Sequence, residues 1–121
     1  MSSKQPSVIN IGLVGGETYC EELLGKTSLI GGVTQVTDQI VAVADSNPSS
    51  PGMALARQLG LITVSDYHDL YDPRHNIQLI IVLTPEAVIL DDILQTRPPH
   101  IRILSYHIFE IFWIFLIFWI F

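Results

Sequence analysis

The sequence predicts an α/β protein with an open, parallel β-sheet and helices on both faces. Short apolar segments alternate with segments of helical pattern along most of the chain. Several of the apolar segments have no polar face, which is typical of strands in a parallel sheet that is covered on both sides. Right-handed crossover connections then favour a sheet of about five strands in the order 3-2-1-4-5.

Each expected strand is an apolar segment bounded by turn residues or by a helical pattern. The expected strands are Val8–Val14, Ile40–Ala44, Ile62–Val64, Ile77–Leu83 and Ile101–Leu104. The segments Val8–Val14 and Ile77–Leu83 are almost continuously apolar, so both faces of these two strands should be buried.

The segments between the strands have helical patterns. The first helix is expected over Glu17–Leu24, ended by Gly25 or by a later glycine pair. Thr84 is expected to cap the helix after the fourth strand, with Pro85 as its first residue. Apolar residues at helical spacing mark one further helix, and these are Met53, Leu55, Ala56 and Leu59.

A glycine turn connects the first strand to the first helix. Gly15 and Gly16 follow the apolar strand directly, and Asp45 ends the second strand. This order is typical of a dinucleotide-binding βαβ unit, in which the glycine turn aims a helix N-terminus at a pyrophosphate and the acid binds ribose hydroxyls. The sequence therefore predicts a Rossmann-like domain. Its expected ligand-binding residues are Gly15, Gly16, Glu17, Asp45, Ser46, Thr84 and Pro85.

The glycine turn departs from the G-x-G-x-x-G pattern of dinucleotide-binding proteins. With Gly15 as the first glycine, Glu17 and Cys20 occupy the second and third positions. Glu17 adds bulk and negative charge where the backbone should approach the pyrophosphate most closely. The interval of 30 residues from Gly15 to Asp45 also exceeds the usual spacing of about 20. Phosphate binding is therefore expected to be weak, unless Gly16 takes the second position in a shifted register.

Two interpretations stay open for each of three positions. Asp45 either binds ribose hydroxyls or caps the turn that follows it. Cys20 either has a thiol pKa lowered by the helix dipole or is a small packing residue. Thr84 either contacts a ligand or only caps a helix. Acidic and histidine residues between positions 66 and 75 resemble metal ligands, but their pattern is more typical of a solvated helical turn, so we predict no metal site.

Two segments carry a resemblance to a known family. They are VAVADSNP (Val41–Pro48) and ALARQLGLITVSDYHDLYDPRHNIQLIIVLTPEAV (Ala54–Val88). These segments resemble the N-terminal Rossmann half of the glucose–fructose oxidoreductase/inositol dehydrogenase family, and the similarity covers roughly residues 8–105. The resemblance implies NAD as the cofactor. Similar modules precede sensor and histidine-kinase domains in bacterial signalling proteins, which implies a sensory or regulatory role.

The catalytic position of the resembled family differs in this chain. That family has a lysine-containing motif after the fifth strand as its catalytic acid–base. Here Ser105-Tyr106-His107 occupies the region, and no lysine follows Lys26. We therefore expect a non-catalytic ligand-sensing or regulatory module without oxidoreductase turnover. Two alternatives stay open: the cofactor-binding fragment of an NAD-dependent oxidoreductase that lacks its substrate domain, and a dimerisation scaffold without a ligand.

Charge and cysteine content restrict the partners and the compartment. The 121 residues include 6 Lys+Arg and 12 Asp+Glu, which gives a net charge of -6. This acidic excess gives no electrostatic basis for binding nucleic acid or an anionic membrane surface. The single cysteine excludes an internal disulfide, and the N-terminus has no apolar signal segment, so we expect a cytoplasmic protein.

The last residues follow a different pattern. Residues 108–121 read IFEIFWIFLIFWIF, with the pair Ile-Phe at every third position. A period of three fits neither a helix nor a strand, and the stretch is shorter than the ~20 apolar residues that span a bilayer. We expect residues 1–107 to form the Rossmann-like domain, and residues 108–121 to be an apolar tail that promotes homo-oligomerisation without spanning a membrane.

Overall fold

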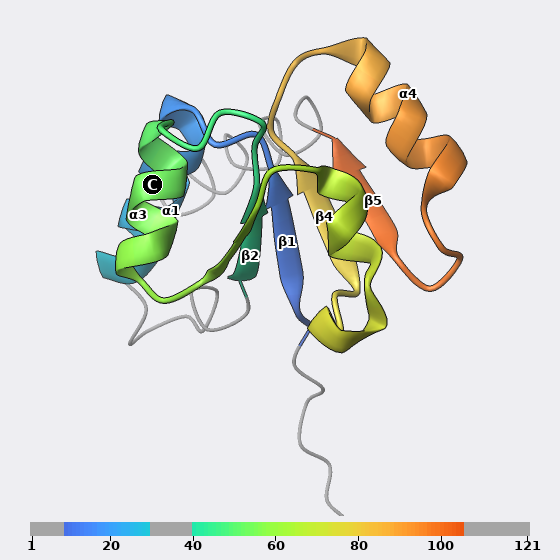
Figure 1. Ribbon diagram of the computed structural model, residues 1–121, viewed down its shortest axis with the longest axis horizontal. Helices are drawn as coiled ribbons and strands as arrows, with labels where there is room; N and C mark the ends of the chain where they lie inside the picture. The colour runs from blue at the N-terminus through green and yellow to red at the C-terminus, as the bar shows by residue number, and fades with distance from the viewer. Residues whose placement is uncertain (1–8, 30–39, 106–121) are drawn as a thin grey trace, which may run out of the picture.

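The fold is an open, five-stranded sheet in which every pairing is parallel (Figure 1). A computed structural model describes residues 9–29 and 40–105 of the chain. The strand order is β3-β2-β1-β4-β5, so the predicted order 3-2-1-4-5 is confirmed. The strands are β1 (Ile11–Val14), β2 (Ile40–Ala44), β3 (Ile62–Val64), β4 (Leu79–Val82) and β5 (Arg102–Ser105).

Helices cover both faces of this sheet, as predicted. Helices α1 (Thr18–Leu29) and α3 (Pro51–Gln58) pack against each other, and in Figure 1 they lie across the strands from α4 (Ala87–Thr96). The β3–β4 connection contains two short 3₁₀ helices, η1 (Tyr67–Tyr71) and η2 (Pro73–His75). Helix α1 connects β1 to β2, α3 connects β2 to β3, and α4 connects β4 to β5. Each is a crossover between parallel neighbours in the sheet.

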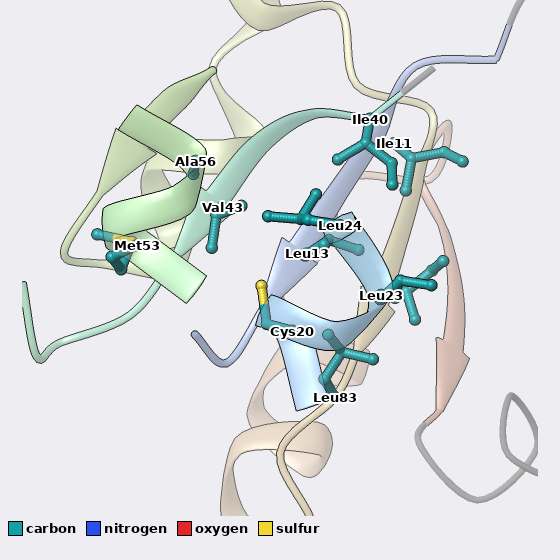
Figure 2. Packing of buried hydrophobic residues seen from close by; sticks show 11 residues of the cluster. Ile11, Leu13, Cys20, Leu23, Leu24, Ile40, Val43, Met53, Ala56 and Leu83 are labelled. Atoms are coloured by element: carbon teal, nitrogen blue, oxygen red, sulfur yellow. The ribbon is translucent and has the colours of Figure 1, made fainter. Parts of the chain in front are cut away.

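The central strands β1, β2 and β4 are buried on both faces because their side chains point alternately into two separate cores. In β1, Ile11 and Leu13 join the core under α1 and α3, whereas Val14 joins the core under η1 and α4. In β4, Ile81 belongs to the first core and Ile80 to the second. Figure 2 shows the first core, in which side chains of both helices meet β1 and β2. This two-sided burial explains why these three strands have almost no polar residues.

One of the two predicted ends of the first helix is excluded, and the start of α4 differs from the prediction. Helix α1 continues past Gly25 to Leu29, and the later glycine pair lies outside the described residues. Gly25 lacks the positive φ of a glycine that caps a helix C-terminus, so it does not terminate the helix. Helix α4 begins at Ala87 with Glu86 as its N-cap residue, not at Pro85. The Thr84 hydroxyl oxygen accepts a hydrogen bond from the Glu86 backbone N–H at 3.3 Å, so Thr84 closes a turn before the helix instead of capping it.

Strand β1 begins at Ile11, and Ile9 and Asn10 lie outside it, so the predicted start at Val8 is wrong. The prediction of an apolar tail concerns residues 108–121, which lie outside the described ranges. Within residues 9–29 and 40–105, none of the helices has the length and apolar character needed to cross a membrane.

Candidate functional site

The glycine turn after β1 adopts a conformation that only glycine takes without strain. Gly15 has a φ of +107°, and its N–H donates to the Ala44 carbonyl oxygen at 2.9 Å. A Cβ on Gly15 would lie 3.1 Å from the backbone nitrogen of Thr84. The turn therefore passes close to the ends of both β2 and β4, the two strands that flank β1.

The Asp45 carboxylate holds this turn in place. Its Oδ2 accepts a hydrogen bond from the Gly16 N–H at 2.7 Å, and its Oδ1 accepts one from the Asn47 N–H at 2.9 Å. The prediction that Asp45 caps the turn is therefore confirmed. Each carboxylate oxygen has a second lone pair, so Asp45 retains the capacity to accept hydrogen bonds from a ligand. Its ribose-binding role stays a prediction.

Helix α3 supports the turn from behind, a contact that sequence analysis did not identify. The Gly52 N–H donates to the Gly16 carbonyl oxygen at 2.7 Å. A Cβ on Gly16 would lie 2.6 Å from the Ser50 Oγ and 2.9 Å from Asp45 Oδ2. Glycine at position 16 thus serves close packing inside the domain, and the turn is fixed by contacts to β2 and α3.

Cys20 occupies the position of the third glycine and is a packing residue. Its side chain is fully buried in the first core (Figure 2). Burial, together with the charges of Asp45 and Glu21, raises the pKa of the Cys20 thiol to about 12. The hypothesis that this pKa is lowered is therefore wrong, because burial and the two nearby carboxylates disfavour the thiolate.

A pocket of about 450 Å³ opens at the carboxyl ends of the first four strands. Chain segments that leave β1 and β4 for opposite faces border it, which is where open α/β sheets bind their ligands. Its volume is in the range of small-molecule sites. The lining residues are Val14, Gly15, Glu17, Ala44, Asp45, Ser46, Asn47, Ser65, Asp66, Tyr67, Thr84, Glu86 and Ile89.

The pocket contains most, but not all, of the predicted ligand-binding residues. Five of them line it: Gly15, Glu17, Asp45, Ser46 and Thr84. Gly16 packs against Ser50 and Asp45 inside the domain, and Pro85 is exposed, so neither residue lines the pocket. The sequence analysis did not name the remaining lining residues as ligand-binding residues, although each lies at or after the end of one of the four strands. They are Val14, Ala44, Asn47, Ser65, Asp66, Tyr67, Glu86 and Ile89.

The charge of the pocket is negative. Carboxylates from four different segments line it, and the described lining includes no lysine, arginine or histidine. Carboxylates that line one pocket repel a phosphate group bound in it, most strongly where water is excluded. The hydroxyls and amide of the lining are suited to hydrogen bonds with uncharged polar groups. The four acidic residues are Glu17, Asp45, Asp66 and Glu86.

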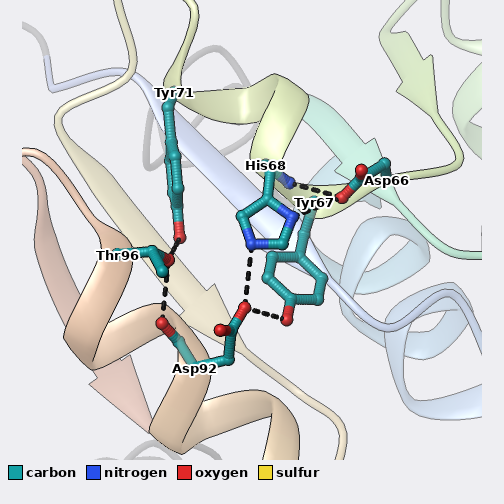
Figure 3. A network of polar contacts seen from close by, with 6 residues as sticks. All are labelled: Asp66, Tyr67, His68, Tyr71, Asp92 and Thr96. Atoms are coloured by element: carbon teal, nitrogen blue, oxygen red, sulfur yellow. Dashed lines mark hydrogen bonds and ion pairs between the residues drawn. The ribbon is translucent and has the colours of Figure 1, made fainter.

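A polar network beside the pocket connects η1 to α4 (Figure 3). His68 lies between the carboxylates of Asp66 and Asp92, and the Tyr67 hydroxyl donates to Asp92 at 2.5 Å. Asp72, at the start of η2, lies outside this network and forms an ion pair with Arg74 at 2.6 Å. In the described part of the chain, no three His, Cys, Asp or Glu side chains are grouped so as to hold a metal ion.

Comparison with models of known protein families gave no match, and no curated protein is significantly similar in sequence. The family resemblance and the function it implies therefore stay predictions from the sequence, whereas the fold rests on the structure.

Proposed function

We propose that this protein is a non-catalytic ligand-binding module of sensory or regulatory type, with its ligand in the pocket at the carboxyl ends of the strands. The observation that carries the proposal is the pocket itself, which the glycine turn and Asp45 frame at the switch point of the sheet. The sensory role draws its support from the resemblance to modules of bacterial signalling proteins.

The lining favours a nucleoside or another hydroxyl-rich ligand without phosphates. Asp45 and Ser46 follow β2 and lie where ribose hydroxyls bind in dinucleotide-binding domains. The apolar side chains of Val14 and Ile89 offer contact area for a base or ring. A phosphate beside the glycine turn would instead meet the charge of Glu17, which lines the pocket at the start of the first crossover.

NAD is the second candidate ligand, and one observation favours it. The order of strand, left-handed glycine and helix is present, with Gly15 at a φ of +107° directly after β1 and three residues before Thr18, where α1 begins. This candidate fits an NAD-binding regulatory module as well as the cofactor-binding fragment of an NAD-dependent oxidoreductase. It requires that Glu17 turn away from the phosphates or that cations screen its charge.

A thermal-shift panel separates these candidates. The full chain is measured with adenosine, AMP, NAD, NADH, NADP and coenzyme A. A ligand at 100 times its dissociation constant should add about 2.7 kcal/mol of stability, which is readily detected as a higher Tm. We expect adenosine to stabilise the protein at lower concentration than NAD. The reverse order makes NAD the ligand, for a regulatory module or for an oxidoreductase fragment, and silence with every compound favours a scaffold without ligand.

Two substitutions at Glu17 separate its charge from its bulk. Glu17→Gln removes the charge at nearly constant size, and Glu17→Gly removes both. We expect both variants to bind NAD more tightly by calorimetry, with the larger gain for Glu17→Gly, while adenosine affinity changes little. Asp45→Ala should weaken both ligands. Asp72→Ala, which removes a turn carboxylate outside the pocket, is the matched control and should leave both affinities unchanged.

A further inference from the structure

His68 is held between two carboxylates that come from different elements. Its Nδ1 lies 2.7 Å from Oδ1 of Asp66, the N-cap residue of η1, and its Nε2 lies 2.8 Å from Oδ2 of Asp92 on α4 (Figure 3). These distances are those of charge-assisted hydrogen bonds. One imidazole ring therefore joins the β3–β4 connection to the helix that follows β4.

Both contacts form together only when the imidazole is protonated. An ionised carboxylate accepts hydrogen bonds and cannot donate one, so each ring nitrogen must carry a proton. A neutral imidazole has a single N–H and loses one of the two bonds. When the bond to Asp92 is lost, a lone pair of the ring nitrogen faces the carboxylate, and that contact becomes repulsive.

The groups that face His68 leave it as the titrating member of the network near neutral pH. The hydrogen bond that the His68 ring donates to Asp66, reinforced by the one it donates to Asp92, raises the pKa of His68 above its ordinary value, although burial opposes the shift. The rings of Tyr67 and Tyr71 flank it, with centroids at 4.4 and 5.7 Å. Burial raises the pKa of Tyr67 to about 12 and also raises that of Tyr71, so both phenols stay neutral.

The two elements joined by His68 are also two walls of the ligand pocket. Asp66 and Tyr67 line the pocket at the start of η1, and Ile89 lines it from α4, three residues before Asp92. We propose that protonated His68 clamps η1 to α4 and fixes the width of the ligand pocket that these elements border. Its effect on a ligand rests on the proposed function, whereas its effect on stability does not.

The direction of the pH effect follows from linkage. A histidine whose pKa is higher in the folded state contributes its full stability below the unfolded value of about 6.5. That contribution disappears as the pH rises through the folded pKa, which is higher. The clamp is therefore closed in mildly acidic solution and released in alkaline solution. The His68 side chain is 43% exposed, so protons reach it without opening of the core.

The first test measures the clamp without any ligand. Thermal unfolding of the full chain is compared at pH 6 and pH 9 for the wild type, His68→Gln and Asp92→Asn. We expect the Tm of the wild type to fall from pH 6 to pH 9, and the fall to be about 2–4 °C smaller in both variants than in the wild type. His100→Gln, which changes an exposed histidine away from this network, should retain the wild-type loss. An unchanged loss in His68→Gln and Asp92→Asn would overturn the proposal.

Ring NMR of the wild type gives a second readout that needs no stable His68 variant. The titration midpoint of His68 should lie above the ordinary histidine value of about 6.5, and Asp92→Asn should lower it. A wild-type midpoint at or below that value, or an unchanged midpoint in Asp92→Asn, would contradict the clamp. Calorimetry with adenosine as the probe then tests the pocket: the wild type should lose affinity between pH 6 and pH 8.5, and His68→Gln should not. If adenosine does not bind at either pH, the proposed nucleoside function fails, while the stability and NMR results decide the clamp separately.

Discussion

The substitution Gly52→Ala tests how closely α3 packs against the glycine turn that frames the pocket. An added Cβ would lie 2.7 Å from the Cys20 Sγ, 2.7 Å from the Gly16 carbonyl oxygen and 2.8 Å from the Cys20 Cβ. Two of these atoms belong to rigid parts of the structure, so the neighbours cannot move away cheaply. Overpacking of this kind costs about 1–3 kcal/mol. Lengthening the 2.7 Å hydrogen bond from Gly52 to Gly16 costs about 1 kcal/mol more.

Gly25→Ala is the matched control, because Gly25 also lies in a helix but has nothing within 4 Å of an added Cβ. Alanine is the better helix former by about 0.5–1 kcal/mol, and that gain applies to both variants. We therefore expect Gly52→Ala to lose about 1–3 kcal/mol net and Gly25→Ala to gain up to about 1 kcal/mol. Thermal or urea unfolding of the full chain measures both, with about 4 °C of Tm per kcal/mol. Equal stability of the two variants would refute the packing of α3 on the turn.

Three further predictions concern the thiol, the tail and catalysis. Cys20 should resist alkylation at pH 8 in the folded protein and react after unfolding, as mass spectrometry can show; rapid labelling of native protein would contradict its burial and its pKa of about 12. Deleting residues 108–121 should give a folded protein of smaller assembly size by light scattering, whereas unfolding would place the tail in the core. Incubation with NAD and polyols, sugars or hydroxy acids should produce no reduced nicotinamide, and steady turnover would overturn the non-catalytic assignment.

The sequence by itself determined the sheet and its order. A central strand buried on both faces must be apolar along its whole length, so β2 could be read with its observed bounds, Ile40–Ala44. The edge strand β3 is partly exposed, and its bounds, Ile62–Val64, followed from the turn residues on either side. The glycine turn and Asp45 were also predictable, because a left-handed residue and a strand-end acid have recognisable local signals. Helix ends were less predictable. An interior glycine such as Gly25 is tolerated when the rest of the helix continues, and Thr84-Pro85 closes a turn that resembles a cap.

Only the tertiary structure decided the character of the site. Asp66 and Glu86 lie far from the glycine turn in sequence, and they reach the pocket because β3 and β4 end at the same edge of the sheet as β1. The burial that raises the Cys20 pKa depends on α3 covering α1, which no local pattern records. The environment of His68 also depends on the fold, because Asp66 lies 2 residues away but Asp92 lies 24 residues away, on another helix. Local sequence sets which segments form strands and turns, whereas charge, burial and hydrogen bonding depend on which segments the fold brings together.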